Sequence, residues 1–184
     1  ADANGENSGA SYVIFGKASG FDATVELSSL DGNNGFRLEG AVAGDYSGRS
    51  VSTAGDFNGD GFADLIIGAF GAEPNGQDSG SSYLVYGKAS GFSASLNLAD
   101  LGSSDGILLN GLAAGDSLGK SVSSAGDVNN DGFDDLIIGA PFGDGNTFNS
   151  GAAYIIFGHS SASETASLKK FEFEVKRSVS KGYQ

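Results

Sequence analysis

The sequence predicts an all-β protein built from small sheets that repeat along the chain. Apolar runs are short and are separated by Gly, Asn, Asp and Ser. Glycine makes up 31 of the 184 residues, roughly twice its average share. The same order of apolar runs returns at a constant interval, and no window in 1–158 has the period of a long amphipathic helix. We therefore expect the core to lie between sheets.

Three glycines mark the repeat. Gly16, Gly87 and Gly158 are evenly spaced and occupy the same place within SGASYVIFGKASGF, SGSSYLVYGKASGF and SGAAYIIFGHSSA. Residues 35–70 match residues 106–141 without a gap. Self-similarity at one fixed period is the signature of a repeat architecture. The expected divisions are the end of a preceding repeat at 1–7, a first repeat at 8–78, a second at 79–149, the start of a third at 150–160 and a divergent tail at 161–184.

Each period contains several short segments with strand character. Strands are predicted at 12–15, 36–38, 51–53 and 65–67, with equivalents one repeat later. The runs at 13–15 and 65–67 are continuously apolar, which is typical of strands covered on both faces. The segment 25–27, like 96–98, is compatible with a fourth strand, a short helical turn or a loop.

Three or four strands in a repeat of this size are typical of a propeller blade. A blade buries its faces only against neighbouring blades, so one repeat is not stable alone. Propellers usually have about 4–8 blades, and this chain supplies about two and a half repeats. The expected fold is all-β with propeller-type blades. The array is open, part of a larger assembly, or completed by neighbouring chains.

The tail from Ser160 has a different composition. It is basic, with five of the ten Lys and Arg residues in the last 16 positions. Phe171, Phe173 and Val175 alternate with charged residues, which predicts an amphipathic strand; a helix is the weaker alternative. Such a strand would cover a blade edge of its own molecule or of another. The segment is also compatible with a linker or a remnant of another domain.

Two loops of nine residues carry the chemistry, and both follow the pattern D-x-N-x-D-G-x-x-D. Oxygens at positions one, three and five can converge on one side of a tight loop, and the glycine at position six permits the reversal. The backbone carbonyl at position seven and the carboxylate at position nine complete the expected oxygen set. The candidate ligands are Asp56, Asn58, Asp60, Phe62 and Asp64 in the first loop, and Asp127, Asn129, Asp131, Phe133 and Asp135 in the second.

These ligands are all hard oxygen donors, which favours Ca²⁺ over zinc or copper. Magnesium fits less well because it demands a small octahedral cage. An EF-hand is rejected, because position twelve is Ile67 or Ile138 where that motif needs a glutamate. Asp, Asn and Gly also form ordinary hairpin turns, but the spacing occurs twice in the same context. We expect two Ca²⁺ sites.

The stretches AGDYSG and AGDFNGDGFADLIIGAF, with a copy that ends in GAP, resemble the FG-GAP repeat of integrin α-subunit propellers and of many secreted bacterial proteins. The resemblance covers roughly residues 8–158. It implies that the loop lies between two strands of a blade and holds Ca²⁺ through the ligands named above. The sequence departs from the family pattern at Phe70, which stands where the copy has Pro141, and in having too few repeats for a ring.

Charge and residue types exclude several other functions. The formal net charge is −13, which opposes binding to nucleic-acid backbones. No apolar run approaches the ~18 residues of a spanning helix, so no membrane insertion is expected. The chain lacks cysteine, and its one histidine, His159, has no partner for general-base chemistry in the sequence context. We therefore expect that this chain is not an enzyme.

The leading hypothesis is an extracellular Ca²⁺-binding module, secreted or displayed on the cell surface, with a structural or adhesive role. Its partner would be a protein or carbohydrate surface ligand. One alternative is a self-assembling subunit of a fibre or surface layer that associates through blade edges or the tail. Another alternative is a non-catalytic accessory region of a larger secreted hydrolase.

Overall fold

The computed structural model of the chain describes residues 2–144 and 149–160. The described residues form strands and two single-turn 3₁₀ helices, η1 (Leu27–Ser29) and η2 (Leu98–Asp100). The all-β prediction is therefore confirmed. The strands are β1 (Ala10–Ile14), β2 (Gly35–Glu39), β3 (Ser50–Gly55), β4 (Asp64–Ala69), β5 (Ser81–Val85), β6 (Ser95–Asn97), β7 (Gly106–Asn110), β8 (Ser121–Gly126), β9 (Asp135–Ala140) and β10 (Ala152–Ile156).

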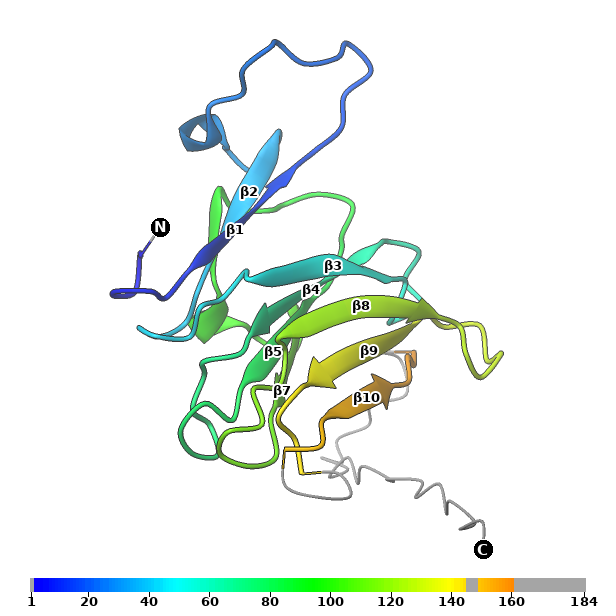
Figure 1. The fold of residues 1–184 in the computed structure, drawn as a ribbon. Helices are drawn as coiled ribbons and strands as arrows, with labels where there is room; N and C mark the ends of the chain where they lie inside the picture. Colours follow the sequence, from blue (N-terminus) through cyan, green and yellow to red (C-terminus); the bar gives the residue numbers. More distant parts are fainter. Residues whose placement is uncertain (1, 145–148, 161–184) are drawn as a thin grey trace, which may run out of the picture.

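These strands form three sheets that follow one another along the molecule (Figure 1). The middle sheet has four strands in the order β3-β4-β5-β7, all antiparallel. The sheet β8-β9-β10 has the same layout for its three strands, and β1 pairs with β2 as β5 pairs with β7. The sheets therefore have the layout of successive propeller blades, and no sheet formed by the described residues closes on itself.

Strand β6 crosses from the middle sheet to the sheet before it. It pairs in parallel with β2, with Leu96 opposite Leu38, although it belongs to the connection between β5 and β7. The segment 96–98 is thus a strand end followed by η2, whereas 25–27 is loop leading into η1. The two copies differ because β6 has a sheet edge within reach, and no such edge faces 25–27 among the described residues.

Two apolar clusters fill the spaces between the sheets. The first cluster joins β2 to the middle sheet through Phe36, Leu38 and Ile67, which are 1% exposed. The second joins the middle sheet to β9 through Ile66 and Leu136. Neighbouring residues of β4 therefore face opposite clusters, as expected for a strand covered on both faces. Each such side chain contributes about 1.5–3 kcal/mol by leaving water.

The same expectation is wrong for β1. Its continuous apolar run includes Ile14, whose side chain is 43% exposed. Within the described residues, the sheet β1-β2 packs against a neighbour on one face only, so the opposite face remains open to solvent.

The described residues also contain no helix long and apolar enough to cross a membrane. The predicted strand at the tail lies outside the described residues.

Candidate metal site

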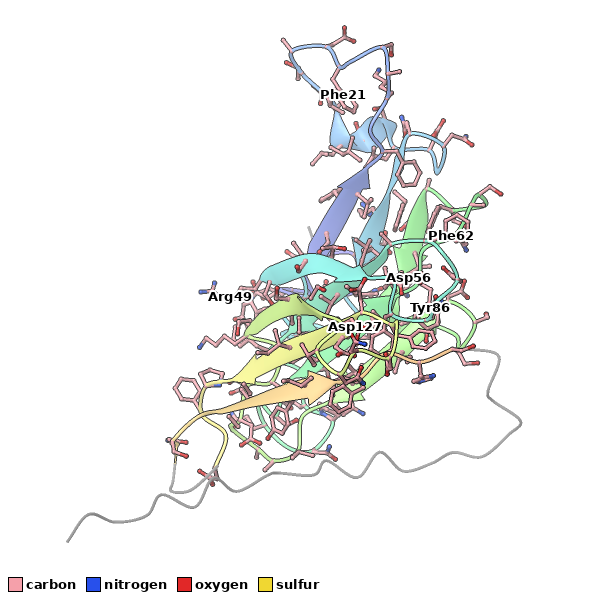
Figure 2. The ribbon with its side chains drawn as sticks, turned by 90° about the vertical axis from the view of Figure 1, so that its right-hand side faces the viewer. Phe21, Arg49, Asp56, Phe62, Tyr86 and Asp127 are labelled. Atoms are coloured by element: carbon pink, nitrogen blue, oxygen red, sulfur yellow. The ribbon has the colours of Figure 1, made fainter. Side chains whose placement is uncertain are left out.

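The two loops lie side by side at one end of adjacent sheets. Residues 56–63 connect β3 to β4, and residues 127–134 connect β8 to β9. Figure 2 shows Asp56 and Asp127 at this end of the strands, with Arg49 at the other end. Each incoming strand ends in a register shift at Gly55 or Gly126, where φ is 69° or 67°. This shift is a β-bulge, which redirects the chain into the loop.

The first position of each loop organises the turn. One carboxylate oxygen of Asp56 accepts from the Asp60 N–H at 2.9 Å, and the other accepts from the Gly61 N–H at 3.0 Å. Asp127 makes the same pair of contacts, to Asp131 and Gly132, at 3.1 and 2.9 Å. At the sixth position the φ of Gly61 is 87° and that of Gly132 is 94°, values that favour glycine.

Positions three and five lie beside the first. The Asn58 amide oxygen accepts from the Asp60 N–H at 3.0 Å, and the Asn58 side chain donates to the Asp60 carboxylate at 2.9 Å. The Asp60 carboxylate also accepts from the Phe62 N–H at 2.9 Å. The second loop repeats this arrangement at its equivalent positions. Oxygens at positions one, three and five are thus brought together in both loops.

The ninth position has a different surrounding. Asp64 is 0% exposed, and its carboxylate accepts from the Phe57 N–H at 3.0 Å and from the Gly87 N–H at 2.8 Å. Burial raises the pKa of Asp64 to about 6, although both N–H groups oppose this shift. Asp135 is also 0% exposed and accepts from Val128 at 2.8 Å and from Gly158 at 2.9 Å.

In each loop the carboxylate at position nine therefore connects the start of the loop to the residues just after β5 or β10. Sequence spacing predicts a closing ligand at position nine and does not reveal this pair of backbone contacts. Each carboxylate oxygen has two lone pairs, so a hydrogen bond leaves room for a further ligand. Phe62, whose carbonyl is the candidate at position seven, has a side chain that is 40% exposed.

The donor set fits a hard divalent cation. The described residues contain no group of three or more His, Cys, Asp and Glu side chains already arranged around a metal position. Three carboxylates and an amide in one loop are nevertheless the oxygen donors that Ca²⁺ uses. A bound Ca²⁺ would offset two of the three negative charges, with Asp56, Asn58 and Asp60 holding it from one side of the loop.

The second loop covers the first. The Asp134 carboxylate accepts from the Asp56 N–H at 2.8 Å, and the Phe133 ring lies so close to Gly59 that a Cβ there would collide with it. As a result Asn58 is only 6% exposed, whereas the equivalent Asn129 is exposed. Asp134 stands where the first loop has Ala63. This difference between the copies is the sequence signal that could have identified the contact.

A solvent-open hollow lies beside the first loop. Lys88 and Asp105 form an ion pair at 3.4 Å along its wall. Figure 2 shows Tyr86 near Phe62 and Asp56 on this side of the molecule. The residues that line the hollow are Asn58, Asp60, Tyr86, Gly87, Lys88, Ser103, Ser104 and Asp105. Asn58 and Asp60 of the first loop therefore line a hollow that is open to solvent.

His159 lies next to the first loop. Its backbone N–H donates to the Phe57 carbonyl at 3.0 Å, and its ring meets the Phe57 ring edge-on at 6.0 Å. His159, which follows β10 in the chain, thus contributes to the contact between the sheet of β10 and the middle sheet.

Two segments of the chain match a known repeat family. The FG-GAP repeat family matches residues 47–85 and 119–156. These segments run from just before β3 to the end of β5, and from just before β8 to the end of β10, so each contains one candidate loop. This chain carries FG-GAP repeats.

Relatives of the FG-GAP chain include several integrin alpha proteins. It is 35% identical to integrin alpha-PS5 of Drosophila melanogaster over 122 residues, which are 66% of this chain and 11% of the relative. It is 34% identical to integrin alpha ina-1 of Caenorhabditis elegans over 135 residues, 70% of this chain and 11% of the relative. For integrin alpha-3 of Cricetulus griseus the identity is 34% over 105 residues, 57% and 9% of the two chains. The FG-GAP chain therefore spans about a tenth of the length of these relatives.

Proposed function

We propose that this chain is an extracellular adhesion-type module in which two Ca²⁺ ions stabilise the hairpins of successive FG-GAP blades. The observation that carries the proposal is the convergence of Asp56, Asn58 and Asp60 in one loop, which recurs in the second loop. The integrin alpha relatives support the adhesive part of the proposal. We also propose that the chain divides into a first repeat at 8–78 and a second at 79–149.

The proposed ligands are the ten residues named from the sequence. In the first loop they are Asp56, Asn58, Asp60, the carbonyl of Phe62, and Asp64; in the second loop they are Asp127, Asn129, Asp131, the carbonyl of Phe133, and Asp135. Asp64 and Asp135 would act while keeping their backbone contacts, because each oxygen can accept more than one interaction. Two divalent ions would cancel four of the thirteen net negative charges.

Calcium would stabilise the blades through linkage. An ion that binds only the folded state adds RT ln(1 + [L]/Kd) to the free energy of unfolding, about 2.7 kcal/mol at a hundredfold excess over Kd. Extracellular Ca²⁺ modules commonly have Kd values of about 10⁻⁴–10⁻³ M. Sites of this strength would be filled outside the cell and largely empty in cytosol, which supports the proposed location. The module itself has no catalytic role in this proposal.

The test is an ion count combined with thermal unfolding. Calorimetric titration of the chelator-treated protein should give two Ca²⁺ ions per chain, and Asp60→Ala and Asp131→Ala should each remove one. Asp22→Ala, an exposed carboxylate outside both loops, is the control and should keep two. Chelation should lower Tm by several degrees. An unchanged Tm together with no heat of Ca²⁺ binding would refute the proposal.

Self-assembly is a second candidate, which rests on the strand edges. In the complete sheet, the outer edge of β5 is covered by β7. Strand β10 has the place of β5 in its own sheet, and no described strand covers that edge. Uncovered edges pair readily with other chains. Light scattering decides this point, since a subunit that assembles through its edges gives a mass that rises with protein concentration.

A further inference from the structure

An apolar groove lies between the middle sheet and the sheet that follows it. It separates β7 from β10 and runs beside the second apolar cluster. The side chains that line it are Leu109, Asn110, Leu118, Ile138, Tyr154 and Ile156. On β7 the inward-facing Leu109 is only half-buried, and Leu108 next to it is 48% exposed. The edge of this sheet is therefore less covered than its counterpart in the preceding sheet.

The equivalent junction one repeat earlier is closed by the chain itself. Leu38, the counterpart of Leu109, is 1% exposed. The segment 92–101 lies over it: the Phe92 ring stacks on Phe36 with centroids 4.5 Å apart, and Leu98 is 2% exposed. Strand β6 within this segment pairs in parallel with β2, and the Arg37 N–H donates to the Ala94 carbonyl at 2.9 Å.

The sequence offers a second copy of three residues of this covering segment. Ala94-Ser95-Leu96, which contains the start of β6, recurs as Ala166-Ser167-Leu168. Both follow a glycine at the end of a strand, Gly87 or Gly158, and the second connection is one residue longer. The later copy lies outside the described part of the chain.

We propose that the groove between β7 and β10 binds residues 166–168 of this same chain as a short strand parallel to β7. In this arrangement Leu168 lies opposite Leu109, as Leu96 lies opposite Leu38, and its side chain enters the apolar groove. Ser167 lies opposite Leu108, as Ser95 lies opposite Arg37. The shared feature of the two junctions is the parallel backbone pairing, with one leucine facing the apolar cluster.

Two of the residues that cover the first junction, Phe92 and Leu98, have the polar counterparts Glu164 and Lys170 in the second copy. One hydrogen-bonded contact of the first junction also has no counterpart in the second. The Asn4 side chain donates to the Gly40 carbonyl at 2.7 Å and to the Asn97 side chain at 3.0 Å. Asn75 makes the equivalent bond to the Gly111 carbonyl at 2.7 Å. Lys169 stands in the place of Asn97 and has no side-chain acceptor. The second strand is thus held by backbone pairing and by Leu168, and it is the weaker of the two.

The absence of cysteine from the chain permits a direct test by disulfide trapping. Under mild oxidation, the double variant Leu108→Cys with Ser167→Cys should form an intramolecular disulfide, because the two Cα atoms face each other in the proposed register. The control is Leu108→Cys with Ser163→Cys, which lies out of register and should stay reduced. Non-reducing electrophoresis and peptide mapping measure the product, and circular dichroism confirms that both variants fold.

Three results would overturn the proposal. The first is the absence of the disulfide in the first variant, and the second is an equal yield in the control. The third is a disulfide-linked dimer, which would assign the groove to a second copy of the chain. A further variant supplies an independent readout: Leu168→Asp should increase binding of a hydrophobic dye and speed hydrogen exchange in β7, whereas Ser180→Asp should do neither. Each of these measurements should give the same result with and without Ca²⁺. Failure of the proposed strand is therefore distinguishable from failure of the Ca²⁺ proposal.

Discussion

The carboxylate of Asp134 accepts a hydrogen bond from the backbone N–H of Asp56 at 2.8 Å, and the Asp134 N–H donates to the Asp56 carbonyl at 3.3 Å. This reciprocal pair joins the loop of one sheet to the loop of the next. It fixes the residue that begins the first candidate metal site. The two loops are therefore one structural unit, although they belong to different repeats of the sequence.

Removing this carboxylate should destabilise the contact between the sheets. Asp134→Ala should lower the free energy of unfolding by about 1.5–3 kcal/mol, the range for a hydrogen bond to a charged group. Urea denaturation measures the change. Asp134→Asn, which keeps an acceptor, should lose less. Asp105→Ala breaks a half-exposed ion pair with Lys88 and an exposed hydrogen bond from the Ser104 hydroxyl, and should cost about 1 kcal/mol or less. An equal loss in Asp105→Ala and Asp134→Ala would contradict the structural role of Asp134.

The same contact should couple the two proposed Ca²⁺ sites. In Asp131→Ala the first loop is the remaining site, and adding Asp134→Ala should weaken its Ca²⁺ affinity by about fivefold or more, the lower limit of typical coupling. The physical reason is that Asp56 loses the partner that holds its backbone. Calorimetry of the two variants measures the difference. Asp131→Ala with Asp22→Ala, an exposed carboxylate outside both loops, is the matched control; if it weakens binding equally, coupling through Asp134 is refuted.

Asp64 should give the metal-free protein a distinctive pH dependence. Its pKa is raised from 3.8 to about 6 in the folded state, so between these values the folded state holds a proton that the unfolded state has lost. The contribution of Asp64 to stability is then full below pH 4 and decreases as the pH rises to 6, by no more than about 1.4 kcal/mol per pH unit.

Comparison with Asp64→Asn isolates this contribution, because all other groups remain. The difference in unfolding free energy between the two proteins, measured in chelator, should change between pH 4 and 6 and level off above. Asp64→Ala should be the least stable variant, because it leaves the buried N–H groups of Phe57 and Gly87 without their acceptor, at about 1–3 kcal/mol each. A flat difference across this range would contradict the raised pKa.

Phe92 and Phe21 provide a matched pair for testing the cover over β2. They occupy equivalent positions in the two repeats, and each has a lysine over its ring at 5.1 Å, Lys88 and Lys17. Phe92 stacks on Phe36, whereas Phe21 is 50% exposed on a loop that stands away from the sheets (Figure 2). Phe92→Ala should cost about 2–4 kcal/mol, and Phe21→Ala should cost about 0.5 kcal/mol or less. Thermal unfolding of the two variants measures this; equal losses would contradict the cover.

The sequence is sufficient to predict what a single repeat contains. The predicted strands at 36–38 and 65–67 lie within β2 and β4, and the glycines at position six of the loops have the positive φ that their reversal requires. These features follow from local patterns of apolar residues, Asp, Asn and Gly. The same patterns indicate which oxygens come together at positions one, three and five.

Contacts between repeats are not predictable in this way. The parallel pairing of β6 with β2, the bridge from Asp134 to Asp56 and the exposure of Ile14 depend on which sheet lies next to which. A residue such as Asp134 is informative only where it departs from its copy, Ala63. The backbone contacts of Asp64 are likewise hidden, because a ligand and a buried anchor look the same in sequence.

The parallel pairing of β6 with β2 also delays the completion of the first sheet during synthesis. A ribosome releases β1 and β2 first, yet the outer edge of β2 is paired only after the chain has been made as far as Asn97. This nascent sheet is therefore completed by residues translated later, from the connection within the sheet that follows. A polypeptide stalled before that point would present a bare strand to its neighbours on the polysome, where edge-to-edge pairing between chains is the competing reaction.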